Sequence, residues 1–154
     1  MTWSRGAPRI ALAAALWLAA SRSEAACTIS TTSVSFGTYN VYAASTVDTT
    51  GSVTYTCGLL TLNPISIDLS KGVSASFNPR TLKNGSNALN YNLYMDAALS
   101  SIWGDGTGGT SHYTATLSPL STYVVTLTVY GRVPALQDVA TGAYVDTIVV
   151  TVNF

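Results

Sequence analysis

The chain has 154 residues, of which 47% are hydrophobic and 9% are charged, and its formal net charge is zero. A chain of this length corresponds to one domain. The balance of charge argues against a nucleic-acid-binding protein and supplies no basic patch for anionic lipid, so neither partner is expected.

Residues 1–25 have the pattern of a cleaved export signal. Two arginines precede the apolar run Ile10–Ala20, and small residues precede an expected cut after Ala25. The run is too short to span a bilayer, which needs about 20 apolar residues. A lipoprotein signal would have small or aliphatic residues before Cys27, and Glu24 does not fit that pattern. We therefore predict export through the Sec pathway, a domain over 26–154 and no transmembrane segment.

The expected mature domain carries a small negative charge, because four basic residues and six aspartates remain after residues 1–25 are removed. Its two cysteines indicate one disulfide, Cys27–Cys57, because an even count in an exported chain is typical of pairing. Closing a loop of this length stabilises a fold by roughly 3 to 4 kcal/mol on the chain-entropy model. A redox pair or a zinc site needs closer spacing or more ligands than this sequence has.

Short runs of alternating apolar and polar residues follow, and no stretch shows a helical stripe. The runs are Val34–Phe36, Val53–Cys57, Ile65–Leu69, Leu89–Met95, Val125–Val129 and Tyr144–Phe154. Turn signals separate them at Lys71-Gly72, Asn78-Pro79, Asn84-Gly85, residues 104–109, Ser118-Pro119 and Thr141-Gly142. This spacing predicts an all-β fold, an antiparallel β-sandwich. An Ig-like Greek key is the expected topology, although a jelly roll or a small barrel has the same periodicity.

The last run reaches the end of the sequence. Its even-numbered positions include Ile148, Val150, Val152 and Phe154, and polar residues occupy most of the odd positions. An apolar strand needs a neighbour on each side, and no further residues follow to supply one. We therefore expect an open strand edge at the C-terminal end of the fold.

The mature sequence offers little for catalysis. His112 is its single histidine, no glutamate remains after the expected cut, and no G-x-S-x-G nucleophile elbow occurs. The aspartates are scattered in turns and on polar sides of strands, where solvation explains them. Two of them about 5 to 10 Å apart would suit a hydrolase, and the sequence does not decide that distance. We expect no enzyme activity and no cofactor.

The glycine-rich segment Trp103–Gly109 has three interpretations. An aspartate among glycines can bind calcium, but one carboxylate is few for an ion that takes six to eight oxygens. A phosphate-binding loop requires a following helix, and none is predicted here. A hairpin connection anchored by Trp103 remains, and no metal site is predicted.

Several aromatic residues suggest an adhesive surface. The candidates are Tyr39, Tyr42, Trp103 and Tyr113. Residues 39–43 form an apolar stretch that would suit adhesion if exposed. Tyrosines at the ends of a sandwich also pack their rings and hydrate their hydroxyls, so a packed loop is the alternative.

Several blocks together resemble the spore coat protein U domain family. They are Cys27 at the start of the mature chain, Val34–Tyr39, Gly51–Cys57, Leu89–Tyr94, Trp103–Gly109, Tyr130–Pro134 and Gly142–Val152. They cover essentially the whole mature chain in order. The family includes subunits of archaic chaperone–usher pili, used for surface attachment and biofilm formation, and a spore coat protein.

The resemblance implies an Ig-like sandwich that lacks its final strand. A periplasmic chaperone would lend a strand first, and the N-terminal segment of a neighbouring pilus subunit would then replace it. The resemblance also implies an outer-membrane usher as a partner. The C-terminal strand with Ile148, Val150, Val152 and Phe154 would pair with the chaperone. The protein would be in the periplasm in transit and then in a pilus on the cell surface.

One feature departs from that family pattern. A donor segment precedes the first cysteine in such pilins, whereas the expected cut leaves only Ala26. The expected subunit would accept a strand without giving one. Two other functions remain open: a self-complete adhesive or ligand-binding module, and a structural protein of a spore or cyst coat.

Overall fold

The computed structural model describes residues 27–58, 64–118 and 120–153, so the expected signal at 1–25 lies outside the described residues. The described residues form eight strands and no helix, and thus contain no helix able to cross a membrane. The strands are β1 (Cys27–Thr32), β2 (Val47–Cys57), β3 (Ile65–Leu69), β4 (Arg80–Asn84), β5 (Asn87–Tyr94), β6 (Tyr113–Ala115), β7 (Tyr123–Val133) and β8 (Val150–Asn153).

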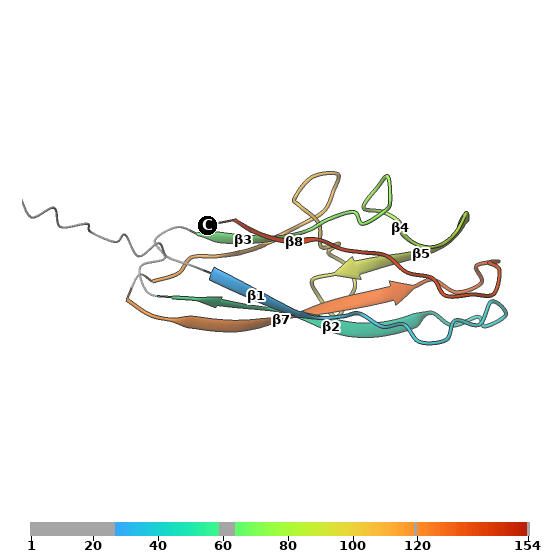
Figure 1. Ribbon diagram of the computed structural model, residues 1–154, viewed down its shortest axis with the longest axis horizontal. Coiled ribbons are helices and arrows are strands. Elements are labelled where there is room, and N and C mark those ends of the chain that lie inside the picture. The colour runs from blue at the N-terminus through green and yellow to red at the C-terminus, as the bar shows by residue number, and fades with distance from the viewer. Residues whose placement is uncertain (1–26, 59–63, 119, 154) are drawn as a thin grey trace, which may run out of the picture.

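The strands form two sheets that lie face to face (Figure 1). The larger sheet has the order β1-β2-β7-β5-β4, the smaller one has the order β6-β3-β8, and all of these pairs are antiparallel. The alternating pattern of the sequence explains the arrangement, because each strand turns its apolar side chains toward the other sheet. The prediction of an all-β antiparallel sandwich is confirmed.

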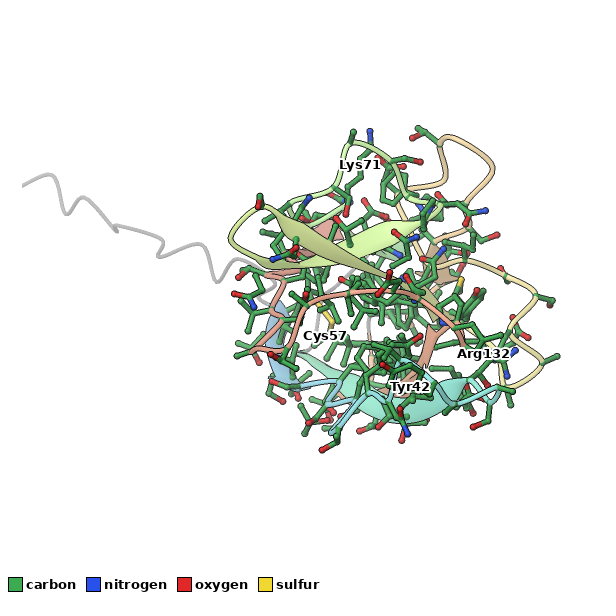
Figure 2. The ribbon with its side chains drawn as sticks, turned by 90° about the vertical axis from the view of Figure 1, so that its right-hand side faces the viewer. Tyr42, Cys57, Lys71 and Arg132 are labelled. Atoms are coloured by element: carbon green, nitrogen blue, oxygen red, sulfur yellow. A yellow bond between two sulfur atoms is a disulfide. The ribbon has the colours of Figure 1, made fainter. Side chains whose placement is uncertain are left out.

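The centre of the larger sheet is the pair β2–β7, which runs in register from Val47↔Val133 to Cys57↔Tyr123. β1 lies on the other side of β2, and Cys27 faces Cys57 in that register. The two cysteines form the expected disulfide, which Figure 2 shows beside the label of Cys57. This bond fixes the edge strand β1 to the sheet.

The chain leaves the sheet after Thr32, so the strand expected over Val34–Phe36 is not present as such. These residues cross the inner face of the larger sheet, where Val34 lies against Gly51 of β2 and Gly131 of β7. The Phe36 ring then packs edge-on against the Tyr91 ring, with 5.7 Å between the two ring centroids. The two glycines are required here because a Cβ on either would come within 2.8 Å of Val34.

A buried arginine explains why β4 escaped the periodicity analysis. Arg80 is 0% exposed, and its side chain occupies an inward position where a strand normally has an apolar residue. Its Nε donates to the Ser70 carbonyl, Nη1 to the Asn92 amide oxygen and Nη2 to the Trp103 carbonyl. The Phe77 ring lies 5.2 Å from the guanidinium. These contacts satisfy a charge that has no carboxylate partner at hydrogen-bond distance among the described residues, and burial lowers the pKa of Arg80.

The C-terminal segment passes from one sheet to the other. Val145 exchanges two backbone hydrogen bonds with Lys83 of β4, and β8 then pairs with β3. Side chains nevertheless alternate inward and outward from Tyr144 to Asn153. The expected strand over 144–154 is therefore correct in its alternation, but only Val150–Asn153 forms a ladder, and Phe154 lies outside the described residues.

Candidate functional site: a groove between two strand edges

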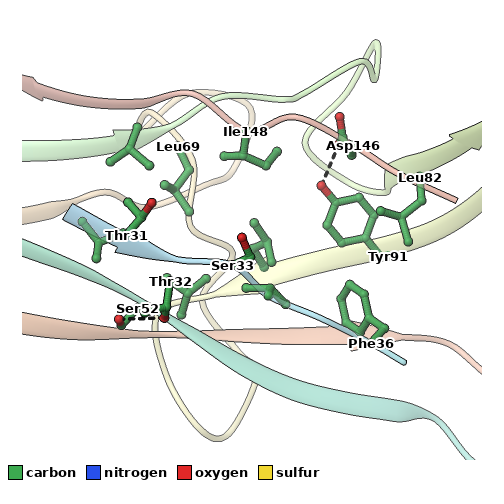
Figure 3. A pocket seen from close by; sticks show the side chains of 15 residues that line it. Thr31, Thr32, Ser33, Phe36, Ser52, Leu69, Leu82, Tyr91, Asp146 and Ile148 are labelled. Carbon is green, nitrogen blue, oxygen red and sulfur yellow. Dashed lines mark hydrogen bonds between the residues drawn. The ribbon is translucent and has the colours of Figure 1, made fainter. Parts of the chain in front are cut away.

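A groove runs between the first and the last parts of the described fold (Figure 3). On one side are β1 and its continuation, with Thr31, Ser33 and Phe36. On the other side is the C-terminal segment, with Asp146 and Ile148. The cavity has a volume of about 200 Å³.

The floor of the groove is apolar. Val53, Leu69, Leu93 and Val129 line it from both sheets, and each is nearly fully buried. Their burial places the floor in the same hydrophobic core that holds the two sheets together. A side chain that enters the groove would therefore join the core rather than rest on the surface.

Each wall of the groove includes a strand edge. β1 ends the larger sheet and β8 ends the smaller one, and among the described strands neither has a second neighbour. An edge strand presents a row of backbone N–H and C=O groups that can pair with another strand. The groove therefore combines an apolar floor with backbone hydrogen-bonding groups at its rims.

One end of the groove is polar. The Tyr91 hydroxyl donates to Asp146 Oδ2 at 2.6 Å, and Asp146 Oδ1 accepts from the backbone N–H groups of Val73 and Thr147 (Figure 3). Burial, followed by the bond to Asp146, raises the pKa of Tyr91 above its usual range. This cluster fixes the C-terminal segment where it leaves β4.

Two of the four residues that were predicted to pair with a chaperone strand line this groove. Ile148 and Val150 line it, and Val152 packs against the core on the same side of the segment. Phe154 lies outside the described residues. Sequence analysis missed the opposite wall, because a strand over 34–36 was expected to pair rather than to cross the sheet.

The four candidate adhesive residues do not form one surface. Tyr42 is 89% exposed, whereas the Tyr39 hydroxyl donates to the Pro134 carbonyl and is only partly exposed. Tyr113 lies on β6 with its hydroxyl 3.1 Å from that of Tyr55. Trp103 is 1% exposed and donates from Nε1 to the Ile67 carbonyl, so it is a core residue, and its assignment to a surface is corrected.

The glycine-rich segment after Trp103 is a closed turn. Asp105 Oδ1 accepts from both the backbone N–H and the hydroxyl of Thr107, and these bonds lower the pKa of Asp105. Gly106, Gly108 and Gly109 have positive φ angles, which explains the glycines. Within the described residues, no three His, Cys, Asp or Glu side chains gather as a metal site would require.

Comparison with known proteins identifies the family. The model of the Spore Coat Protein U domain matches residues 13–151. The chain belongs to this family. It is 33% identical over 132 residues to Protein U of Myxococcus xanthus, a match that covers 79% of this chain and 71% of that protein.

A solved structure has a similar fold. It is the chaperone–tip adhesion subunit pre-assembly complex CsuC–CsuE from the archaic chaperone–usher Csu pili of Acinetobacter baumannii. The TM-score is 0.55 at 24% identity, and the match covers 84% of this chain. The match covers only about 40% of the solved chain, so the likeness of the present chain to it concerns the sandwich fold.

Proposed function

We propose that this protein is an exported structural subunit of a surface pilus, and that its groove accepts a β-strand from a partner. The observation that carries the proposal is the groove itself, since its apolar floor lies between two strand edges that have no described neighbour. Family membership supports the proposal. So does the likeness in fold to a chain of a complex between a chaperone and a pilus subunit.

The physics of the groove favours a strand as its occupant. Strand addition supplies main-chain hydrogen bonds to the rims, and alternate side chains fill the apolar floor, as in chaperone–pilin pairs. Each apolar side chain fully buried there contributes about 1.5 to 3 kcal/mol. A strand with three or four such residues would therefore stabilise the fold substantially, and an empty groove would expose edges that favour aggregation.

The pilus proposal also implies the partners of the protein and its route to the cell surface. The mature domain would be 26–154 after export, a periplasmic chaperone would occupy the groove first, and an usher would deliver the subunit to a pilus. Ile148, Val150, Val152 and Phe154 would lie beside the chaperone strand. Adhesion and biofilm formation would then be properties of the assembled fibre, and the role of the subunit would be structural rather than catalytic.

A peptide-binding experiment tests the proposal. The full chain is exported, purified, and titrated with a labelled peptide of about ten residues in which Val or Ile alternates with Ser or Thr. We expect saturable binding and a raised melting temperature. A peptide of the same composition with its apolar residues grouped serves as the first control, and it should not bind.

Two substitutions locate the binding. Ile148→Arg places a charge in the groove and should abolish binding. Val149→Arg adds the same charge on the next residue, whose side chain is 59% exposed and faces away, and it should leave binding intact. A purified chain that is monomeric and stable and that ignores both peptides would overturn the proposal and favour a self-complete module.

A coat protein is a second candidate, because the family is named for a spore coat and the chain is similar to Protein U. The groove would then receive a strand from another component of the coat. Deletion of the gene separates the two functions, since loss of surface fibres supports the pilus and an altered spore or cyst coat with fibres retained supports the coat.

A further inference from the structure

A second, shallow and open cavity lies on the opposite face of the larger sheet. Its volume is about 330 Å³, and its walls include Asp48, Thr50, Leu99, Tyr130 and Arg132. Figure 2 labels Arg132, which belongs to β7 and projects from the face of that sheet away from the smaller one. Neighbouring positions such as Val129 and Val133 face the core, so this cavity is separate from the groove.

The polar groups of the cavity form a neutral pair. Arg132 donates from Nε to Asp48 Oδ1 at 2.7 Å and from Nη2 to Oδ2 at 2.6 Å. The two side chains are still 38% and 47% exposed. Because a guanidinium has five N–H donors and a carboxylate about four acceptor sites, the pair retains free donors and free acceptors. A ligand hydroxyl, which both donates and accepts, matches this combination.

An aromatic and an aliphatic side chain stand beside the pair. Tyr130 is the register partner of both Thr50 and Tyr94, so it lies across from a hydroxyl residue on one strand and an aromatic residue on the other. A ring beside hydrogen-bonding groups suits a ligand with one apolar and one polar side. A sugar ring has both, since its C–H groups form a flat face and its hydroxyls form the edge.

The aliphatic wall is held in an uncommon conformation. Leu99 has a φ of 57°, in the left-handed region that few leucines adopt. Asp96 fixes its loop by accepting from the backbone N–H groups of Ser100 and Ser101. The loop held in this way places Leu99 at the wall of the cavity.

Hydroxyl side chains continue from the cavity along the same face. Thr54 and Thr126 are hydrogen-bonded across β2 and β7, and Thr128 is the next exposed hydroxyl residue along β7. This track adds no charge, and the cavity contains one residue of each sign that pair with each other. The surface therefore favours an extended neutral ligand over an anionic one.

We propose that this face binds a neutral polysaccharide, with one sugar ring in the cavity against Tyr130 and its hydroxyls on Asp48 and Arg132. The adjoining sugars lie along the hydroxyl track. The proposal does not depend on the pilus assignment, because the site is on the face opposite the groove.

The test uses the full exported chain labelled with ¹⁵N and titrated with cellohexaose. We expect shifts of the backbone amide signals of Thr50, Leu99, Tyr130 and Arg132, with a Kd of about 1 mM or below. Dextran sulfate of similar length is the comparison for charge, and it should cause no saturable shifts at these amides.

Variants assign the binding to the cavity. Tyr130→Ala and Asp48→Asn should each weaken binding roughly tenfold, which corresponds to about 1.4 kcal/mol. Tyr42→Ala, at an exposed tyrosine elsewhere, should leave the affinity unchanged. The thermal unfolding of each variant is measured to confirm that it is folded.

Three results would overturn the proposal. The first is the absence of shifts at about 10 mM cellohexaose. The second is equal affinity of the wild type, Tyr130→Ala and Asp48→Asn. The third is shifts at the same amides on concentrating the protein without sugar, which would identify a second copy of the chain as the occupant.

Discussion

Gly131 of β7 lies directly beneath the segment that forms one wall of the groove. A Cβ at this position would lie 2.6 Å from Val34 Cγ1 and 2.9 Å from Phe36 Cζ, whereas ordinary contacts begin at 3.4 Å. The φ of Gly131 is not among the positive values of the chain, so alanine fits the backbone and only space is lacking. Gly131→Ala should therefore push Val34 and Phe36 off the sheet.

The cost follows from two opposing effects. Overpacking of this kind destabilises by about 1 to 3 kcal/mol. Replacement of glycine also reduces the entropy of the unfolded chain, which stabilises by about 0.4 to 1 kcal/mol. The expected net loss in the free energy of unfolding is about 1 to 2 kcal/mol, or roughly 3 to 10 °C in melting temperature for a domain of this size.

A double-mutant cycle identifies the contact as the cause. Val34→Ala removes the atom nearest to the new Cβ, so the double variant Gly131→Ala, Val34→Ala should lose at least about 0.5 kcal/mol less than the two single losses combined. Val124→Ala, at a 71% exposed side chain of the same strand, should change stability by less than about 0.5 kcal/mol. The assay is denaturant unfolding of all four variants and the wild type under one set of conditions. Strict additivity would refute the crossing of residues 33–36 over β7.

Three further predictions concern the disulfide, the buried arginine and the tyrosine in the groove. Replacement of both Cys27 and Cys57 by serine should lower the free energy of unfolding by roughly 3 to 4 kcal/mol, and a reductant should lower that of the wild type but not of the variant. Arg80→Lys should cost about 2 to 4 kcal/mol in urea unfolding, because an ammonium cannot reach all three acceptors; a loss below about 1 kcal/mol would contradict the buried geometry. The pKa of Tyr91 is raised above its ordinary value of 10.0, so the stability linked to it is complete below that pH and is lost as the pH rises beyond it. Tyr91→Phe should remove the bond to Asp146, cost about 1 kcal/mol at pH 7 and weaken the alkaline loss, and an unchanged alkaline profile would argue against this assignment.

Local alternation was sufficient to predict the strands whose inner positions are apolar, such as β2, β3, β5 and β7. It missed β1, in which only Cys27 and Ile29 are apolar, and β6, which has only three residues. It also missed β4, where the buried Arg80 occupies an inner position and looks polar in the sequence. A charged side chain can be buried only because Ser70, Asn92 and Trp103 supply acceptors from distant parts of the chain.

The sequence pattern predicted one of the two walls of the groove. The C-terminal wall is visible in the sequence because an extended segment alternates whether or not it is hydrogen-bonded. The other wall depends on Gly51 and Gly131, which lie far from Val34 in sequence and become relevant only when the sheet has formed. The cavity around Arg132 and Asp48 was missed for the same reason, since 84 residues separate the two partners.

The position of the disulfide has a mechanical consequence. A pull applied through Cys27 does not have to peel β1 away one hydrogen bond at a time, because the covalent link passes the load to Cys57 at the end of β2. That strand is held to β7 along eleven register pairs, the longest ladder among the described strands, so the load reaches the centre of the larger sheet. The edge strand β1 is thereby protected from being the first strand to separate from the sheet under tension.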